Sequence, residues 1–239
     1  MEVKVNALCV RATDYKDNDR ILTLCTIEKG KLSAGIKGCK SPKSKLRFAA
    51  SPLCFGEYLL TEKGGRYTVT GCNQIDGFYD IVCDLDKYYA AFAVLEVAER
   101  LTGEDAAACA EITLAALETL RRICYLGESP AAAVLKFVLE CLRLSGYGTG
   151  AADALKEESA LYYYDFAEGG LHPLTGRAGH GVCVSADALR AVVFTEEGRS
   201  VLQFGADAIK EALFFAGRVL EGTCGVSLKN LGQFVQILC

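Results

Sequence analysis

The spacing of apolar residues changes near residue 84, and this change constrains the fold more than any other feature of the sequence. Before it, apolar and β-branched residues alternate with polar ones or form short runs, as β-strands do, over residues 3–10, 21–27, 32–36, 53–60 and 67–70. After it, apolar residues recur every three or four positions, which is typical of one face of an α-helix. This order predicts an α+β protein in which a β module precedes a mostly helical one.

The connections between the predicted strands favour a closed barrel. Residues 28–31 and 63–66 each place glycine between two strand patterns, and glycine readily adopts the positive φ of a tight hairpin turn. Five short strands within residues 1–80 then predict a five-stranded barrel of the oligonucleotide-binding (OB-fold) type, because closure leaves no strand edge exposed. We predict residues 1–80 as a first domain.

Residues 81–239 predict a second, mostly helical domain. Its first helix has Asp84 or Asp86 as the N-cap and closes at residues 102–103, and a second helix continues as far as Gly127. Helical spacing returns near residue 185, over residues 206–220, and weakly after residue 227. We expect the apolar faces of these helices to pack on one another rather than to bind a cofactor.

The third helix has the clearest start in the sequence. Ser129 is its predicted N-cap, Pro130 occupies the first helical position, and Gly146 follows its end. From residue 146 to residue 181 the periodicity fades, and this segment contains eight of the 24 glycines together with both histidines. We predict an irregular insert at residues 146–181, with a short hairpin around residues 161–166.

The cysteines are expected to be buried free thiols. Twelve of them are spread along the chain, mostly among apolar neighbours, and no two form a Cys-x-x-Cys pair. Cysteine is one of the residue types most often buried, so this distribution favours packing over a disulfide scaffold, a zinc site or a redox motif.

Length and composition predict a folded protein of the cytoplasm. The 239 residues, 51% of them hydrophobic, suffice for one large domain or two small ones. The first residues do not have the pattern of a signal peptide. The longest apolar runs fall far short of the roughly 18 residues that indicate a membrane span.

Charge is distributed unevenly along a chain whose net charge is −4. Residues 1–80 contain 13 Lys and Arg against 9 Asp and Glu, a net +4, whereas residues 81–239 contain 13 against 21, a net −8. Residues 29–47 contain seven cations and no anion. Such a run is typical of a solvated loop, but it also creates a local positive field on an acidic protein. We name residues 37–47 the basic segment.

The basic segment and its neighbours predict a nucleic-acid-binding face. Barrels of this type hold single strands by combining a cationic groove with aromatic surfaces on which bases stack. The candidate cations are Arg11, Lys16, Arg20, Lys37, Lys40, Lys43, Lys45 and Arg47. The interleaved aromatic residues are Tyr15, Phe48, Phe55, Tyr58 and Tyr67, each of which is also a candidate for the core. Lysine contributes charge without reading bases, so we expect binding that is independent of sequence.

No catalytic motif supports an enzyme. The sequence has no phosphate-binding Gly-x-x-x-x-Gly-Lys-Ser/Thr loop, no Gly-x-Ser-x-Gly elbow and no His-Glu-x-x-His pair. His172, His180 and Cys183 lie close together in the sequence, and they leave open a Cys/His nucleophile pair or a metal site without a fourth ligand. We predict neither a catalytic function nor a cofactor.

The order of these pieces resembles the RecO family of bacterial DNA repair and recombination-mediator proteins over nearly the whole chain. The likeness runs through residues 7–15, 18–26, 28–33 and 36–47 of the β module. It continues in the helical half with Leu95-Glu96 and with residues 137–147, 169–171 and 225–231.

The resemblance implies a specific function. It implies an N-terminal OB-fold barrel and a helical C-terminal domain that together bind single- and double-stranded DNA, anneal complementary strands and assist RecA loading with RecR and often RecF. It also implies an association with the nucleoid and places the basic segment on the DNA side of the barrel. Many relatives carry two zinc-binding Cys-x-x-Cys pairs in the insert, but here residues 146–153 and 170–176 contain no cysteine. We therefore predict no structural zinc.

The acidic helical half is expected to repel DNA and to bind proteins instead. The resemblance implies the C-terminal tail of single-stranded DNA-binding protein as one partner. An apolar groove near Arg121, Arg122 or Arg143 is a candidate for this acidic peptide, although these arginines are also ordinary surface residues. The alternative is a protein-binding adaptor whose barrel binds a partner protein and whose lysines serve only solubility.

Overall fold

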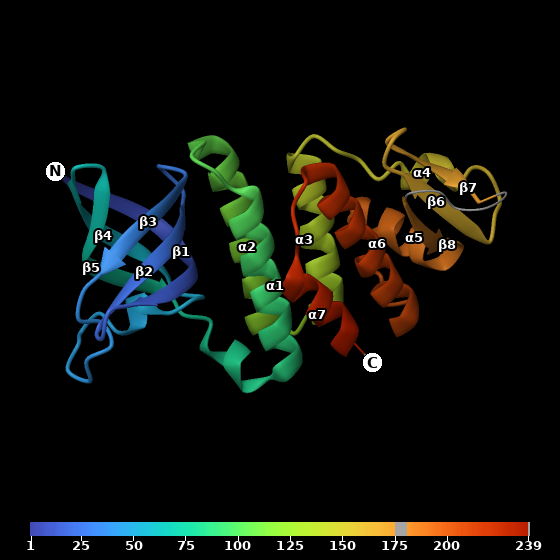
Figure 1. The fold of residues 1–239 in the computed structure, drawn as a ribbon. Helices are drawn as coiled ribbons and strands as arrows, with labels where there is room; N and C mark the ends of the chain where they lie inside the picture. Colours follow the sequence, from blue (N-terminus) through green and yellow to red (C-terminus); the bar gives the residue numbers. More distant parts are fainter. Residues whose placement is uncertain (175–180, 239) are drawn as a thin grey trace.

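A closed five-stranded barrel forms the first part of the chain in the computed structural model, which describes residues 1–174 and 181–238 (Figure 1). Its strands are β1 (Glu2–Tyr15), β2 (Asp19–Thr26), β3 (Lys31–Ile36), β4 (Phe55–Lys63) and β5 (Arg66–Asp76). They close in the order β1-β2-β3-β5-β4, with a parallel β3–β5 pair and antiparallel pairs elsewhere. The predicted five-stranded barrel is confirmed, and each strand includes or overlaps a predicted range.

Inward-facing apolar side chains fill the barrel. Leu22 and Leu24 of β2, Ile36 of β3 and Leu60 of β4 are all fully buried, as the alternation of their strands predicts. Tyr58 is buried among them, and its hydroxyl donates a hydrogen bond to the Ala49 carbonyl oxygen at 3.1 Å. This bond ties the segment after the basic segment to the barrel core.

The β2–β3 turn fits against the helical half of the molecule. Gly30 has a φ of +71°, as predicted for this hairpin. A Cβ at this position would lie 2.4 Å from the Glu104 carbonyl oxygen, and the adjacent Lys31 amide donates to the Gly103 carbonyl at 2.7 Å. Only glycine allows the two backbones to approach this closely.

Replacing Gly30 with alanine is expected to lower the free energy of unfolding by about 2 kcal/mol or more. Alanine is disfavoured at positive φ, and its methyl group would also collide with the Glu104 carbonyl oxygen. Gly64→Ala is the matched control, since Gly64 has a φ of +58° and open space around it. That control should lose only about 1 kcal/mol. Chemical denaturation of the two variants separates the cost of positive φ from the cost of the collision. Equal losses of unfolding free energy would contradict the close approach of Gly30 to the Glu104 carbonyl.

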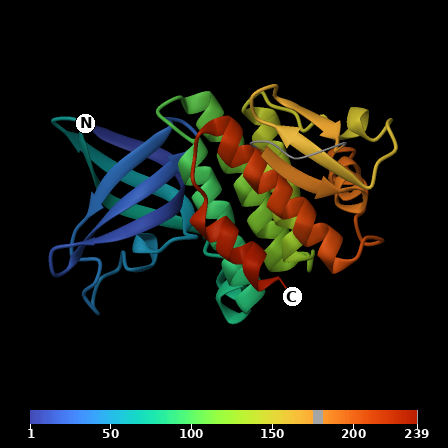
Figure 2. The same cartoon turned by 45° about the vertical axis from the view of Figure 1, so that its right-hand side comes forward.

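The helical half contains six principal helices within the described residues: α1 (Leu85–Leu101), α2 (Ala106–Tyr125), α3 (Pro130–Leu144), α5 (Ala186–Glu196), α6 (Ala206–Cys224) and α7 (Lys229–Ile237). Short turns of 3₁₀ or α-helix occur at η1 (Phe48–Ala50), η2 (Tyr79–Cys83) and α4 (Ala151–Ala154). The barrel packs on α1 and α2, α3 lies behind them, and α6 runs alongside α3 (Figures 1 and 2).

The starts of α1 and α3 lie at the predicted caps. The Asp84 carboxylate accepts a hydrogen bond from the Lys87 amide at the start of α1, which decides between the two predicted N-caps. Pro130 begins α3 as predicted. Ser129 occupies the N-cap position of α3 as predicted, although its side chain makes no capping hydrogen bond.

The chain returns to α1 through its last helix. Leu228, whose side chain has no acceptor, occupies the N-cap position of α7. The Glu96 carboxylate of α1 takes over the capping role and accepts hydrogen bonds from the amides of Lys229, Asn230 and Leu231 at 2.9, 2.7 and 3.1 Å. Glu96 is only 9% exposed, so this carboxylate is a buried cap supplied from a distant part of the sequence.

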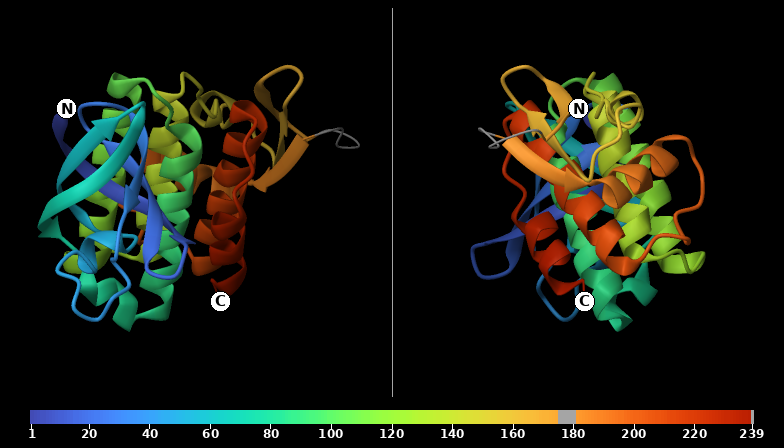
Figure 3. Two further views of the ribbon diagram at one scale, coloured as in Figure 1. Left: turned by 60° about the vertical axis from the view of Figure 1, so that its left-hand side comes forward. Right: turned by 90° about the vertical axis from the view of Figure 1, so that its right-hand side faces the viewer.

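The insert has more regular structure than predicted. Its strands β6 (Leu161–Asp165), β7 (Gly170–Pro173) and β8 (Gly181–Ser185) form a small sheet in the order β7-β6-β8, which protrudes beyond α5 and α6 (Figure 3). The predicted hairpin around residues 161–166 is confirmed, but the prediction of an otherwise irregular insert is wrong. Tyr162 and Tyr164 of β6 point into the helical core and are almost fully buried, so packing orders this sheet.

The prediction of buried thiols holds for most cysteines. Of the eleven in the described residues, all of them free, seven are buried and two are partly exposed. Cys83 and Cys183 are exposed, so the prediction is wrong for these two: Cys83 ends η2 at the surface, and Cys183 lies on the outward face of β8. Cys239 lies outside the described residues. Among the described residues, no helix combines the length and apolar character needed to cross a bilayer.

Candidate nucleic-acid interface

The basic segment folds back onto the turn between β1 and β2. The Gly38 amide donates to the Asp19 carboxylate at 2.8 Å, and the Lys40 amide donates to the Asn18 carbonyl at 3.2 Å. Figures 1 and 2 show both loops at the same end of the barrel, away from the β4–β5 turn. These bonds therefore gather cations from two separate stretches of the sequence onto one end.

Three of the predicted cations surround a single pocket. Arg20, Lys40 and Arg47 line a cavity of about 270 Å³ together with Cys39 and Ser51. Arg20 comes from β2, whereas the others come from the basic segment and its continuation, so the arrangement depends on the fold and not on proximity in the sequence. We name this cavity the cation pocket.

One carboxylate holds two of these cations in place. Asp14 of β1 pairs with Arg20 Nε at 2.8 Å and with Lys40 Nζ at 2.9 Å. The hydrogen bonds from Lys40 and then from Arg20 hold the pKa of Asp14 below its ordinary value. Arg20 also donates from Nη1 to the Ala50 carbonyl at 2.8 Å, which fixes the plane of its guanidinium. Asp14 is therefore a counterion that the sequence prediction missed.

The remaining cations of this face project into solvent. Lys37, Lys43, Lys45 and Arg47 are exposed and form no ion pair with any other described residue. Lys16, at the β1–β2 turn, lies over the Tyr15 ring with Nζ 5.4 Å from the ring centroid. These five side chains are available to an anionic ligand, and we name them the free cations.

Arg11 does not join this group. Its guanidinium pairs with Glu99 of α1 at 2.8 Å, on the side of β1 that faces the helices. A carboxylate from the helical half thus neutralises it, and the structure places Arg11 at the junction of barrel and helices rather than among the free cations.

The predicted aromatic residues divide by burial. Tyr15 is 49% exposed at the end of β1, and it is the one of the five that presents its ring to solvent beside the free cations. Phe48 and Tyr67 pack against the barrel core, Phe55 packs against the helical core, and Tyr58 is fully buried. Base stacking on this face therefore depends on Tyr15 alone among the predicted residues.

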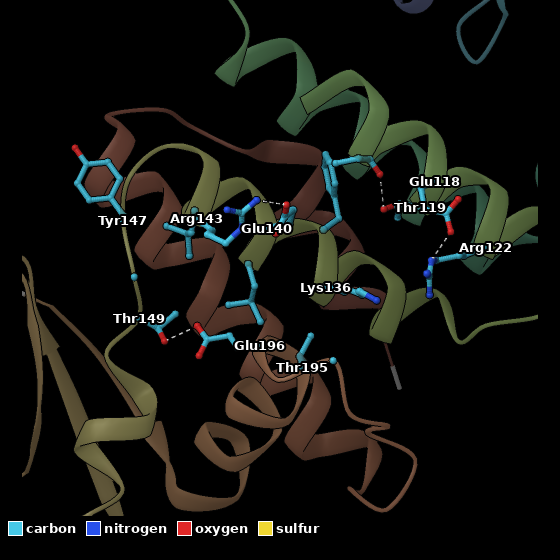
Figure 4. A pocket seen from close by; sticks show the side chains of 16 residues that line it. Glu118, Thr119, Arg122, Lys136, Glu140, Arg143, Tyr147, Thr149, Thr195 and Glu196 are labelled. Atoms are coloured by element: carbon cyan, nitrogen blue, oxygen red, sulfur yellow. Dashed lines mark hydrogen bonds and ion pairs between the residues drawn. The ribbon is translucent and has the colours of Figure 1, made fainter. Parts of the chain in front are cut away.

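A larger pocket lies in the helical half, where an acidic peptide was predicted to bind. Its volume is about 540 Å³, and its walls come from α2, α3, α5 and residues 147–149 (Figure 4). Phe137, Leu139 and Leu142 give it an apolar lining, and Arg122, Lys136 and Arg143 bring cations to it. We name it the helical groove.

The arginines of the helical groove are already paired. Arg143 pairs with Glu140 at 2.6 Å, and Arg122 pairs with Glu118 at 2.9 Å and with Glu128 at 3.2 Å. Arg121 pairs with Glu118 at 3.2 Å but does not line the groove.

Lys136 is the residue that the sequence prediction missed. It lines the groove and forms no ion pair within the described part of the chain. It lies seven residues before Arg143 on α3, two helical turns away, and this spacing could have indicated a shared face.

One acidic side chain lines the groove at its α5 wall. Glu196 accepts a hydrogen bond from the Thr149 hydroxyl at 2.8 Å (Figure 4). Burial raises the pKa of Glu196 above its ordinary value, and the Thr149 hydrogen bond partly offsets this effect.

The structure does not assemble the alternative site in the insert. His172 of β7 and Cys183 of β8 both oppose Tyr163 of the central strand β6, one from each side. Two strand spacings, roughly 10 Å, therefore separate them, which is too far for a hydrogen bond. His180 lies outside the described residues. No group of three or more His, Cys, Asp or Glu in residues 1–174 and 181–238 is placed to hold a metal ion.

Comparison with known proteins agrees with this architecture. Residues 1–78 match the family model described as Recombination protein O N terminal. The chain is 29% identical over 171 residues to the DNA repair protein RecO of Acetivibrio thermocellus, a match that covers 70% of this chain and 68% of the relative. It is 28% identical over 203 residues to the DNA repair protein RecO of Dehalococcoides mccartyi, covering 82% and 79%.

The chain is similar to RecO proteins over most of its length. A shorter match, 36% identical over 91 residues, is found with the DNA repair protein RecO of Clostridium perfringens and covers 38% of this chain and 37% of the relative. This similarity confirms the predicted resemblance and the terms DNA repair and recombination.

Proposed function

We propose that this RecO-like chain binds single- and double-stranded DNA through its phosphate backbone and anneals complementary strands. The observation that carries the proposal is the set of five free cations on one end of the barrel. Two polyanions repel each other, and a cationic face that holds both lowers the repulsion and raises their local concentration. In this proposal, residues 1–80 act as the DNA-binding domain and residues 81–239 as the protein-binding domain.

An annealing assay tests this proposal. Two complementary oligonucleotides, one carrying a fluorophore and the other a quencher, are mixed with and without the protein at low salt. Faster quenching with the protein supports annealing, whereas an unchanged rate at protein concentrations that saturate binding removes annealing from the proposal.

Binding should weaken with salt at a predictable slope. If about four phosphates of a single strand are neutralised, the logarithm of the affinity should fall with the logarithm of the salt concentration at a slope of roughly −3. Fluorescence anisotropy of a labelled oligonucleotide over a series of chloride concentrations measures this slope. Oligonucleotides of different base composition should give the same slope, and a slope near zero would indicate that the free cations do not contact phosphate.

The rival function is a protein adaptor whose barrel binds a partner protein. The exposed apolar residues Ile21 and Leu59 on the outer face of the barrel favour this alternative. Filter binding at moderate salt distinguishes the two functions, because an adaptor would not retain DNA on the filter.

The helical half is proposed to bind proteins, including RecR, possibly RecF, and the acidic C-terminal tail of single-stranded DNA-binding protein. Through these partners it would assist RecA loading on DNA in the cytoplasm. The support is the apolar lining of the helical groove together with the unpaired charge of Lys136. A peptide with acidic and apolar side chains would find a complement to both.

Replacing Lys136 with alanine is expected to weaken binding of such a tail peptide by about tenfold, because its ammonium is the charge of the groove without an internal partner. Arg121→Ala is the matched control, since Arg121 directly precedes the lining residue Arg122 but does not itself line the groove. Isothermal titration calorimetry with a synthetic tail peptide measures the affinity of each variant. An equal loss in both variants would place the peptide elsewhere.

A further inference from the structure

The cation pocket has the charge of a site for a doubly charged anion. Its three cations are Arg20, Lys40 and Arg47, and the one carboxylate in contact with them is Asp14. The net charge of this group is therefore about +2. A phosphodiester inside a strand carries one negative charge, whereas a phosphomonoester carries nearly two at neutral pH.

The donors of the pocket also suit a phosphomonoester. Arg20 is held by Asp14 through Nε and by Ala50 through Nη1, which leaves Nη2 without a partner among the described residues. Arg47 makes no side-chain contact with a described carboxylate. Ser51 also lines the pocket, and its hydroxyl is a neutral donor. A terminal phosphate has three peripheral oxygens, one more than a diester offers, and arginine forks are well matched to them.

We propose that the cation pocket binds a phosphomonoester, namely the terminal phosphate of a DNA strand. The choice of a strand end over a free nucleotide rests on the proposed DNA-binding function, because the loops that carry the other free cations lie at the same end of the barrel and would hold the nucleotides next to the strand end. The pocket itself does not depend on that function, since a free phosphomonoester has the same charge and the same oxygens.

The test compares oligonucleotides that differ only at their ends. Fluorescence anisotropy is measured in phosphate-free buffer with one 12-nucleotide sequence carrying a 5′-phosphate, a 3′-phosphate or no terminal phosphate. We expect about tenfold tighter binding of at least one phosphorylated form. Equal affinity for all three forms would overturn the pocket while leaving DNA binding intact.

Two variants assign the preference to the pocket. Arg47→Gln removes an exposed guanidinium without an internal ion pair and should reduce the preference to within about twofold. Lys63→Gln, in the β4–β5 turn at the other end of the barrel, should retain it. Retention of the full preference in Arg47→Gln would overturn the proposal, and a preference lost in both variants would do the same.

A second measurement does not require DNA binding. Thymidine 5′-monophosphate and thymidine are added to the full chain at equal ionic strength, and the melting temperature is recorded. Stabilisation by the monophosphate alone, absent in Arg47→Gln, supports the pocket even if no oligonucleotide binds, in which case the proposed function fails and the ligand is the free nucleotide. If neither compound changes the melting temperature and no end preference exists, the pocket is not a phosphomonoester site.

Discussion

Replacing Glu96 with alanine is expected to lower the free energy of unfolding by about 3 kcal/mol, the largest effect of any single substitution considered for this chain. Its carboxylate caps α7 through the amides of residues 229–231 and is 9% exposed. Without it, three donors at the first turn of α7 lose their partner in a place that water reaches poorly. The melting temperature should fall by about 6–12 °C.

A graded series checks the origin of this effect. Glu96→Gln keeps one acceptor oxygen but loses the charge, so its loss should lie between that of Glu96→Ala and zero. Glu111→Ala, at an exposed position of α2, removes a glutamate of the same size and should change the melting temperature by less than about 2 °C. If Glu96→Ala behaved like Glu111→Ala, the capping role would be wrong.

Reversing the charge of Lys43 and Lys45 together is expected to lower the affinity for single-stranded DNA about a hundredfold at low salt. Both side chains are exposed and free of internal ion pairs, so the substitution removes two phosphate contacts and adds two repulsive charges. The salt slope should fall from roughly −3 to about −1.5, since two of the four contacts are lost. Anisotropy over a salt series measures both quantities.

The matched control reverses two charges at the opposite end of the barrel. Lys63→Glu with Arg66→Glu changes the net charge by the same amount, but these residues flank the β4–β5 turn. This variant should lose only the few-fold affinity that general repulsion accounts for. An equal loss in both double variants would mean that the net charge of the chain, and not the basic segment, governs binding.

The elements of the fold could be predicted because their signals are local. Alternation in β2 and β3, glycine in the two hairpin turns, and Asp84 before α1 each indicate a structure within a few residues. The small sheet of the insert was predicted only as a hairpin, because its strands have four or five residues each and lie in a glycine-rich part of the sequence. Tyr162 and Tyr164 order it by packing against helices that are distant in the sequence.

The candidate site was predictable only in part, for a related reason. The basic segment is visible as a run of charge, but the partners of each cation are decided by the fold. Arg11 pairs with Glu99 of α1. Arg20 and Lys40 both pair with Asp14 at one end of the barrel. Neither pairing has a signal in the sequence, because the residues involved are separated by up to 88 positions or belong to different elements.

The cap on α7 has a consequence for how the chain is made. Glu96 leaves the ribosome more than 130 residues before the amides that it binds. During that interval its carboxylate must stay hydrated, so α1 cannot settle into its final surroundings. The helical half therefore completes its assembly only after synthesis has passed residue 231, and a nascent chain that stalls earlier presents an unfinished surface to chaperones and proteases.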